Sequence, residues 1–309
     1  MTNDHQLVIP SPIQNVNHPL LAECKIQLDV KREDLIHPLV QGNKWRKLKY
    51  QLIEMQRGKS SKLITFGGAF SNHIHATAAA GKLFNIETVG ILRGEDDPNN
   101  PTLNFARKSG TKLHFIPRSE YRLKSESTVV QDILNKYPNH FLSPEGGSGP
   151  LAEKGIKEMA DEINKEDHNV ILISAGTGCT AGYLLKHLDS TKELWVFPSL
   201  KGDFIESEIL KFADKSNCSN LKIINDFTFG GYGKTNDVLI QFINDFTAST
   251  KIPVDPIYNG KLMFGFNDLV ANIKIDVTKK YLWIHTGGLQ GIIAYNYMAD
   301  KKEKLKINQ

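Results

Sequence analysis

Glycine-rich segments with hydroxyl and amide side chains follow three short apolar stretches of the chain. The segment 175–182 reads AGTGCTAG and precedes a helical pattern. The backbone N–H groups of such a turn and the dipole of the helix after it converge on one point, which makes an anion site. The chain has neither the Lys-Ser/Thr pair of a phosphate-binding loop nor a GxGxxG with a later acidic residue, so a nucleotide is not favoured. A plain tight turn of an α/β protein is the alternative.

The two other glycine-rich segments are 67–73, GGAFSNH, and 286–291, TGGLQG. Glycine lets the backbone approach a ligand closely, although Ser71 or Asn72 could equally be the N-cap of the alanine-rich helix that follows. His73 and His75 diverge on a helix, so the sequence predicts no metal site. Open parallel sheets bind ligands at the carboxyl ends of their strands, and we expect the three turns to line one cleft.

Lys44 stands at the start of a helical pattern, beside Arg46 and Lys47. Neighbouring cations and burial both lower the pKa of a lysine, and the free amine is the form that reacts with a carbonyl compound. Because the chain contains 38 lysines and arginines, a solvated surface lysine is the alternative.

The elements that position these residues alternate along the chain. Apolar, β-branched segments predict strands at 62–66, 88–92, 112–116, 170–174, 193–197 and 281–285. Amphipathic patterns predict helices at 42–55, 73–84 and 151–164. Strands that alternate with helices are typical of parallel βαβ units, so we expect an α/β fold. Two such sets occur, and the turn-rich segment 143–150 between them predicts a crossing between domains.

Length and composition restrict the class of protein. A chain of 309 residues with 40% hydrophobic and 23% charged residues is typical of folded globular domains. A net charge of +4 is too small and too scattered for nucleic-acid binding. No apolar run approaches the ~18 residues of a membrane span, and no signal peptide is recognised. The three cysteines lack CxxC spacing, which favours a reducing compartment, and we expect a cytoplasmic location.

Six motifs occur in one order along the chain, namely GNKWRKL (42–48), GGAFSNH (67–73), PEGGSGPLAEKG (144–155), GTGCTAG (176–182), DPIYNGK (255–261) and HTGG (285–288). Together they resemble the 1-aminocyclopropane-1-carboxylate deaminase and D-cysteine desulfhydrase family of pyridoxal-phosphate enzymes. The resemblance implies the fold of the tryptophan synthase β subunit (fold type II), with two open twisted sheets, flanking helices and the cofactor in a cleft between domains. It also implies a large cofactor-binding domain (1–47 and 149–309), a small domain (48–148) and a homodimer.

The resemblance further implies residues that contact the cofactor. Lys44 corresponds to the lysine that binds pyridoxal phosphate covalently, and Asn72 to the asparagine that hydrogen-bonds its phenolic oxygen. Thr286 corresponds to a position near the pyridine nitrogen. The loop around the cofactor phosphate corresponds to Gly176, Thr177, Gly178, Cys179 and Thr180, which agrees with the anion site expected from the turn itself.

Other positions bear on the substrate. By resemblance Ser71, Tyr232 and Tyr258 face the substrate. Cyclopropane-carboxylate deaminases carry a glutamate that can protonate the pyridine nitrogen where this chain has Asn259, a neutral amide.

Three further positions depart from the deaminase pattern. Those enzymes usually have a glutamine where His73 stands, and their turn lacks the hydroxyl of Thr286. Phe70 replaces a glutamine that is frequent in the family.

These observations predict a pyridoxal-phosphate-dependent lyase that acts on a small amino acid by α,β-elimination, with D-cysteine converted to pyruvate, ammonia and sulfide. The catalytic candidates are Lys44, Ser71, Tyr232 and Tyr258, and either Asn259 or Thr286 would be the neutral partner of the ring nitrogen. Deamination of 1-aminocyclopropane-1-carboxylate is the alternative reaction. The alternative of another class is a protein that binds pyridoxal phosphate or an amino acid without turnover.

Overall fold

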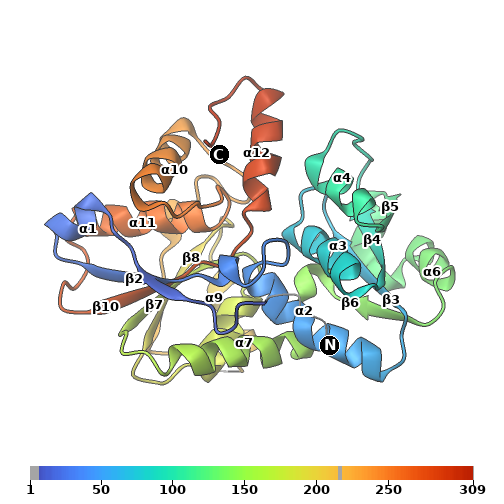
Figure 1. Ribbon diagram of the computed structural model, residues 1–309, viewed down its shortest axis with the longest axis horizontal. Helices are drawn as coiled ribbons and strands as arrows, with labels where there is room; N and C mark the ends of the chain where they lie inside the picture. Colours follow the sequence, from blue (N-terminus) through green and yellow to red (C-terminus); the bar gives the residue numbers. More distant parts are fainter. Residues whose placement is uncertain (1–6, 215–217, 309) are drawn as a thin grey trace. The chain divides into compact units, whose positions relative to one another are not determined.

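The computed structural model describes residues 7–214 and 218–308, and the chain folds as two compact units (Figure 1). The first unit contains residues 37–155, and the second contains residues 8–36 and 156–308. Each unit has one sheet with helices on its faces, which confirms the expected α/β fold with two sheets and flanking helices. The domain boundaries expected from the sequence stay a prediction.

The first unit is built on a four-stranded parallel sheet with the strand order β5-β4-β3-β6. Its elements are α2 (Gly42–Arg57), β3 (Lys62–Gly67), α3 (Asn72–Phe84), β4 (Glu87–Arg93), α4 (Pro101–Lys108), β5 (Lys112–Ile116), α5 (Arg118–Leu123), η2 (Lys124–Glu126), α6 (Thr128–Asn135), β6 (His140–Ser143) and η3 (Glu145–Gly147).

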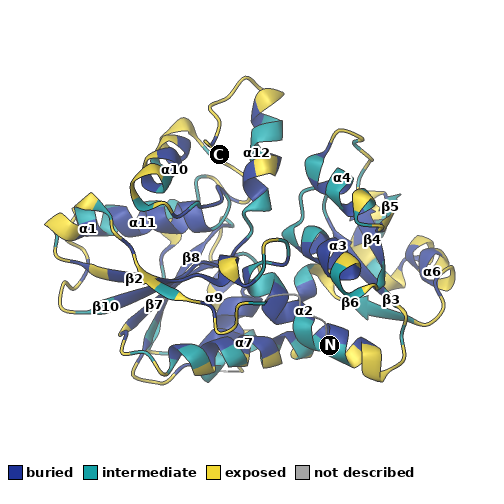
Figure 2. Cartoon of the chain, in the orientation of Figure 1, coloured by how far each residue is buried: buried dark blue, intermediate teal, exposed yellow. Residues whose placement is uncertain are grey.

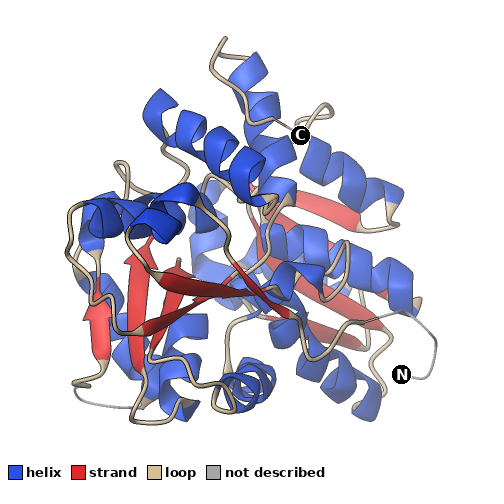
Figure 3. Ribbon diagram, turned by 60° about the vertical axis from the view of Figure 1, so that its left-hand side comes forward, coloured by secondary structure: helices blue, strands red, loops and turns tan. Residues whose placement is uncertain are grey.

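Successive side chains of a strand point to opposite faces, and both faces of this sheet are apolar. Ile64 and Val89 pack with α5 and α6, whereas Leu92 packs with α3 and α4. The strands in the middle of the unit are therefore buried (Figure 2), and helices flank them (Figure 3).

The second unit contains a six-stranded sheet with the order β1-β2-β10-β7-β8-β9, in which β1 alone pairs antiparallel. Its strands are β1 (Ile13–Asn15), β2 (Gln27–Lys31), β7 (Val170–Ala175), β8 (Glu193–Pro198), β9 (Leu221–Ile223) and β10 (Lys280–Ile284). Its helices are α1 (Pro19–Glu23), η1 (Glu33–Leu35), α8 (Cys179–His187), α9 (Phe204–Ala213), η4 (Asn225–Phe227), α10 (Asp237–Thr250), α11 (Asn259–Ala271) and α12 (Gln290–Asp300).

Helices also cover this sheet. Leu172 and Trp283 belong to a cluster that includes apolar residues of α10 and α11, and these two helices lie above the strands in the view of Figure 1. The helix α7 (Pro150–Ile163), which continues from the first unit into the second, lies below them. Because β10, β7 and β8 run parallel, their carboxyl ends lie at one edge of the sheet. The expected ligand-binding turns of this unit begin there, after β7 and β10.

Two motifs of the first unit meet through a glycine. A Cβ atom on Gly155 of α7 would lie 1.9 Å from the carbonyl oxygen of Arg46 in α2. Only a glycine permits this approach. It holds α2, the helix that begins with the GNKWRKL motif, against the start of α7, which carries the end of the PEGGSGPLAEKG motif.

Among the described residues, no helix has the length and the apolar character needed to cross a membrane.

Candidate functional site

The turn after β7 has the geometry of an anion site. Gly178 lies at the N-cap of α8 with φ +80°, and no side chain caps the helix there. A Cβ atom on Gly178 would also lie 3.2 Å from the backbone nitrogen of Ile209, so this position requires glycine. The first N–H groups of an α-helix have no partner within the helix. With Thr177 exposed and Thr180 buried, the turn fits an anionic group such as a phosphate.

The side chain of Asp255 holds the backbone at the start of α11, which belongs to the same unit as the anion turn. Its side chain is fully buried and accepts hydrogen bonds from the backbone nitrogens of Ile257 (2.9 Å), Tyr258 (2.8 Å) and Asn259 (3.0 Å). It also accepts one from the Asn259 amide nitrogen at 2.8 Å. A buried carboxylate needs such donors, because an unpaired charge in the interior is costly. The aspartate therefore fixes the backbone that presents Tyr258 and Asn259.

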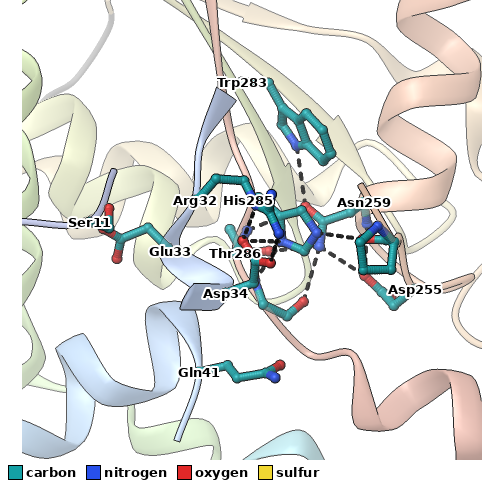
Figure 4. Close-up of polar contacts among 12 residues, drawn as sticks. Ser11, Arg32, Glu33, Asp34, Gln41, Asp255, Asn259, Trp283, His285 and Thr286 are labelled. Carbon is teal, nitrogen blue, oxygen red and sulfur yellow. Dashed lines mark hydrogen bonds and ion pairs between the residues drawn. The ribbon is translucent and has the colours of Figure 1, made fainter. Parts of the chain in front are cut away.

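The amide of Asn259 connects α11 to the turn after β10 (Figure 4). Its nitrogen donates to the carbonyl of Gly287 at 3.1 Å, and its oxygen accepts from the indole of Trp283 and from the backbone of Thr286, both at 3.3 Å. Asn259 has no exposed surface. Both ends of the amide are thus occupied by protein groups, which indicates a role in holding the turn in place.

Thr286 has a hydroxyl with weaker contacts than those of Asn259. Its Oγ1 lies 3.4 Å from the Asn259 amide nitrogen and 3.4 Å from the hydroxyl of Ser174, and the residue is 7% exposed. Contacts of this length leave the hydroxyl able to reorient toward a ligand. Of the two residues expected near a pyridine nitrogen, Thr286 has the more available polar atom.

A second set of contacts supports the same turn. It involves His285, at the end of β10, and two residues that follow β2. His285 Nδ1 accepts from the backbone nitrogen of Gly287 at 3.2 Å, so its Nε2 carries the proton and donates to the carbonyl of Pro253 at 2.8 Å. Asp34 lies 3.6 Å from His285 and accepts two hydrogen bonds from the guanidinium of Arg32, at 2.9 and 2.7 Å (Figure 4). The sequence analysis did not single out Arg32, Asp34 or His285, because their contacts join segments that are far apart in the sequence.

Tyr258 lies against the anion turn. A Cβ atom on Gly176 would be 3.3 Å from the hydroxyl of Tyr258, so a larger residue there would push the phenol by a few tenths of an ångström. The rings of Tyr232 and Tyr258 meet edge to face with centroids 6.2 Å apart. Burial raises the pKa of Tyr258 well above its ordinary value, and the charge and hydroxyl of Tyr232 raise it further. Tyr258 therefore stays protonated at neutral pH and can donate a hydrogen bond.

Lys44 lies in the first unit, in the first turn of α2. Its Nζ donates to the carbonyl of Gly146 at 3.4 Å, and the next carbonyl of that turn, of Gly147, accepts from Gln51 at 2.9 Å. The side chain is half-buried. The turn η3 thus contacts the lysine amine through the carbonyl of Gly146.

The residues of the GGAFSNH motif lie in the same unit. Ser71 is the N-cap of α3 and accepts from the backbone nitrogens of His73 and Ile74, at 3.2 and 3.3 Å, so the N-cap expectation is confirmed. Asn72 is the first residue of this helix and is half-buried.

His73 is buried, and its Nε2 lies 2.9 Å from the hydroxyl of Thr65. Burial lowers the pKa of His73 well below 6.5, and the charges of Lys44 and Lys47 lower it further. A neutral imidazole therefore lies near the two lysines.

The structure brings the predicted site residues together in two groups, one in each unit. The first unit gathers Lys44, Ser71 and Asn72 with His73, and the second gathers the 176–180 turn, Tyr232, Tyr258, Asn259 and Thr286. The expectation that all of them line one cleft stays a prediction. Within residues 7–214 and 218–308, no three His, Cys, Asp or Glu side chains form a group suited to a metal ion.

The hydrogen bonds of the Asn259 amide predict that its removal lowers the stability of the fold. Replacing Asn259 with Ala leaves buried partners of the amide without hydrogen bonds, and we expect the free energy of unfolding to fall by about 3 kcal/mol. Asn272→Ala is the matched control, because this exposed asparagine makes one bond to the carbonyl of Asp268 and should change stability by less than about 0.5 kcal/mol. Urea unfolding measures both, and equal effects would contradict the assignment.

The low pKa of His73 predicts how stability depends on pH. Below pH 6.5 the unfolded chain binds a proton at this position that the folded chain does not bind, so the wild type loses stability as the pH falls. His73→Gln removes this loss. Between pH 7.5 and pH 5 we expect the variant to lose about 1–2 kcal/mol less than the wild type in urea titrations. Identical losses in the two proteins would show that His73 is not held neutral.

Known proteins with related sequences and folds were found, although no family model matches the chain. The bifunctional D-cysteine desulfhydrase/1-aminocyclopropane-1-carboxylate deaminase of Arabidopsis thaliana is 29% identical over 311 residues, which cover 92% of this chain and 77% of that protein. A solved structure of an ACC deaminase homologue is 24% identical, covers 96% of this chain and 94% of its own, and has a TM-score of 0.81. A pyridoxal 5'-phosphate-dependent aspartate racemase is 14% identical, with coverages of 90% and 90% and a TM-score of 0.65. These two solved structures show the fold, and the curated relative confirms the resemblance read from the motifs.

Proposed function

We propose that this chain, a relative of the 1-aminocyclopropane-1-carboxylate deaminase and D-cysteine desulfhydrase proteins, is a pyridoxal-phosphate-dependent lyase that eliminates a β-substituent from a small amino acid. The observation that carries the proposal is the arrangement at the carboxyl end of β7. There an uncapped helix N-terminus, a required glycine and a protonated phenol adjoin one another. D-Cysteine is the proposed substrate.

The residues present fit pyridoxal phosphate. The backbone N–H groups at 176–180 suit its phosphate, since an anion at a helix N-terminus is stabilised by the unpaired N–H groups and the helix dipole. The amine of Lys44 suits its aldehyde, and the hydroxyl of Thr286 suits its ring nitrogen. When bound, this cofactor supplies an electron sink for the negative charge left when the α-proton of an amino acid departs.

Lys44 has two proposed tasks that the same atom performs. Its Nζ would hold the cofactor through the aldehyde group, and the same amine would accept the α-proton of the substrate. Elimination from D-cysteine then releases sulfide with the electrons of the Cβ–S bond, and addition of water gives pyruvate and ammonia.

The uncharged hydroxyl of Thr286 favours elimination in this proposal. A hydroxyl beside the ring nitrogen supplies no negative charge, unlike the glutamate that the deaminases carry at the position of Asn259. The cofactor is then a weaker electron sink, which suits a substrate that loses a good leaving group at once. Tyr258 donates a hydrogen bond to the substrate carboxylate in this proposal, and Ser71 contributes a second hydroxyl.

Deamination of 1-aminocyclopropane-1-carboxylate remains the second candidate, because the curated relative from Arabidopsis is named for both reactions. Ring opening needs a nucleophile, which would be Tyr258 or Ser71. The raised pKa of Tyr258 keeps its phenol protonated and weakens it as a nucleophile. We therefore keep D-cysteine as the proposed substrate. The homodimer and the cytoplasmic location stay predictions.

A panel of four amino acids tests the substrate. We expect the purified protein, loaded with pyridoxal phosphate, to release sulfide and pyruvate from D-cysteine at a rate at least about tenfold above its rate on 1-aminocyclopropane-1-carboxylate, because the neutral ring-nitrogen partner favours a good leaving group. L-Cysteine and D-serine complete the panel.

Lys44→Ala with the same amount of cofactor is the control for reaction catalysed by free pyridoxal phosphate. Faster turnover of the cyclopropane amino acid would establish the deaminase, and no turnover of any of the four would favour a binding protein.

A further inference from the structure

Lys261 is a buried cation that the proposed mechanism does not use. It lies in the first turn of α11, two residues after Asn259, and is 1% exposed. Its Nζ donates to the carbonyls of Thr228 and Gly231, at 2.8 Å each. An ammonium group in the interior is costly unless it is hydrogen-bonded. These two bonds are therefore the structural reason for a lysine at this position.

The carbonyls that Lys261 binds belong to a segment with little regular structure, 228–234. Gly230, Gly231 and Gly233 adopt φ values of +86°, +112° and +69°, a region that glycine enters at low cost. Two turn bonds, from Gly231 to Thr228 and from Lys234 to Gly231, hold the backbone locally. Such a segment has many accessible conformations, and an anchor at 228 and 231 removes most of them.

This segment carries Tyr232, whose position matters to the candidate site. Tyr232 is 49% exposed, and its ring meets that of Tyr258 edge to face at 6.2 Å. The hydroxyls of the two tyrosines also interact and raise the pKa of Tyr258. Tyr258 in turn lies over Gly176 of the anion turn. A chain of contacts thus runs from Lys261 through the backbone of 228–231 to both tyrosines.

We propose that Lys261 is a positioning residue that anchors segment 228–234 and thereby holds Tyr232 against Tyr258 at the substrate side of the site. The proposal rests on the proposed function for its kinetic consequence, but the anchoring itself does not depend on turnover. Burial lowers the pKa of Lys261 to about 8, and the charge of Asp255 opposes this shift. At pH 7 most molecules therefore carry the ammonium form, which can donate to both carbonyls.

Limited proteolysis tests the anchoring without any activity. Lys234 is exposed within the segment, so trypsin cleavage after it reports how freely 228–234 moves. We expect Lys261→Met, which keeps an unbranched apolar side chain but donates no hydrogen bond, to be cleaved after Lys234 at least about tenfold faster than the wild type. Lys274→Met is the matched control, because Lys274 is an exposed lysine that follows the same helix, and its cleavage should match the wild type. Unchanged cleavage in folded Lys261→Met would overturn the proposal.

A double-mutant cycle then tests whether Lys261 acts through Tyr232. We expect Lys261→Met to raise KM more than it lowers kcat, with kcat/KM reduced at least about tenfold, since a misplaced contact residue weakens substrate positioning. In a Tyr232→Phe background the same substitution should have less than about a twofold effect. Full additivity of the two losses would overturn the route through Tyr232.

A second variant covers the case in which Lys261→Met does not fold. Lys261→Gln retains N–H donors on a shorter side chain, and we expect cleavage after Lys234 and KM between those of the wild type and a protein without the anchor. Wild-type values for both would contradict the proposal. If the protein turns over no amino acid, the cleavage assay alone decides the anchoring, so failure of the proposed function and failure of the anchor are distinguishable.

Discussion

The buried carboxylate of Asp255 is the interaction on which the second unit's part of the site depends. It accepts three backbone N–H groups and one amide N–H from the start of α11, and each is a charge-assisted hydrogen bond in a medium without competing water. These bonds set the backbone from which Tyr258 reaches the anion turn. They also orient the Asn259 amide, which holds the turn that carries Thr286.

The hydrogen bonds around Asp255 also distinguish residues that support the site from residues that are available to a ligand. Asn259 is saturated by protein partners, whereas Thr286 keeps a hydroxyl with two long contacts. In the first unit, burial keeps His73 neutral, and the amine of Lys44 donates to the carbonyl of Gly146. The second unit's part of the site therefore combines a buried, hydrogen-bonded support, Asn259, with the Thr286 hydroxyl, whose contacts are long.

Much of this arrangement could be predicted from the sequence because its signals are local. The strand expected at 62–66 is observed at Lys62–Gly67, and the helix expected at 73–84 begins one residue earlier, after the N-cap Ser71. Strand β2 was missed because its sequence, QLDVK, includes Asp29 and Lys31. Asp29 contacts the ring of His168, and Lys31 forms an ion pair with Glu162, both residues far away in the sequence.

The roles of buried polar residues were harder to foresee. The position of Asn259 suggested a contact with the cofactor ring, but an amide can serve protein and ligand equally well. Only the partners of both its ends, which are Asp255 nearby and distant residues of β10 and the turn after it, reveal the supporting role. Lys261 ends the DPIYNGK motif, but the sequence indicated no buried role for it, because a lysine in a helix is normally solvated.

The location of the covalently bound cofactor tests the central claim most directly. The protein would be incubated with pyridoxal phosphate, reduced with borohydride, digested and examined by mass spectrometry. The account predicts a phosphopyridoxyl group on Lys44 and its absence from that peptide in Lys44→Ala, with Lys49→Ala, a change on the same helix, labelled like the wild type. Labelling of a different lysine in the wild type, or no stable labelling of any, would contradict it.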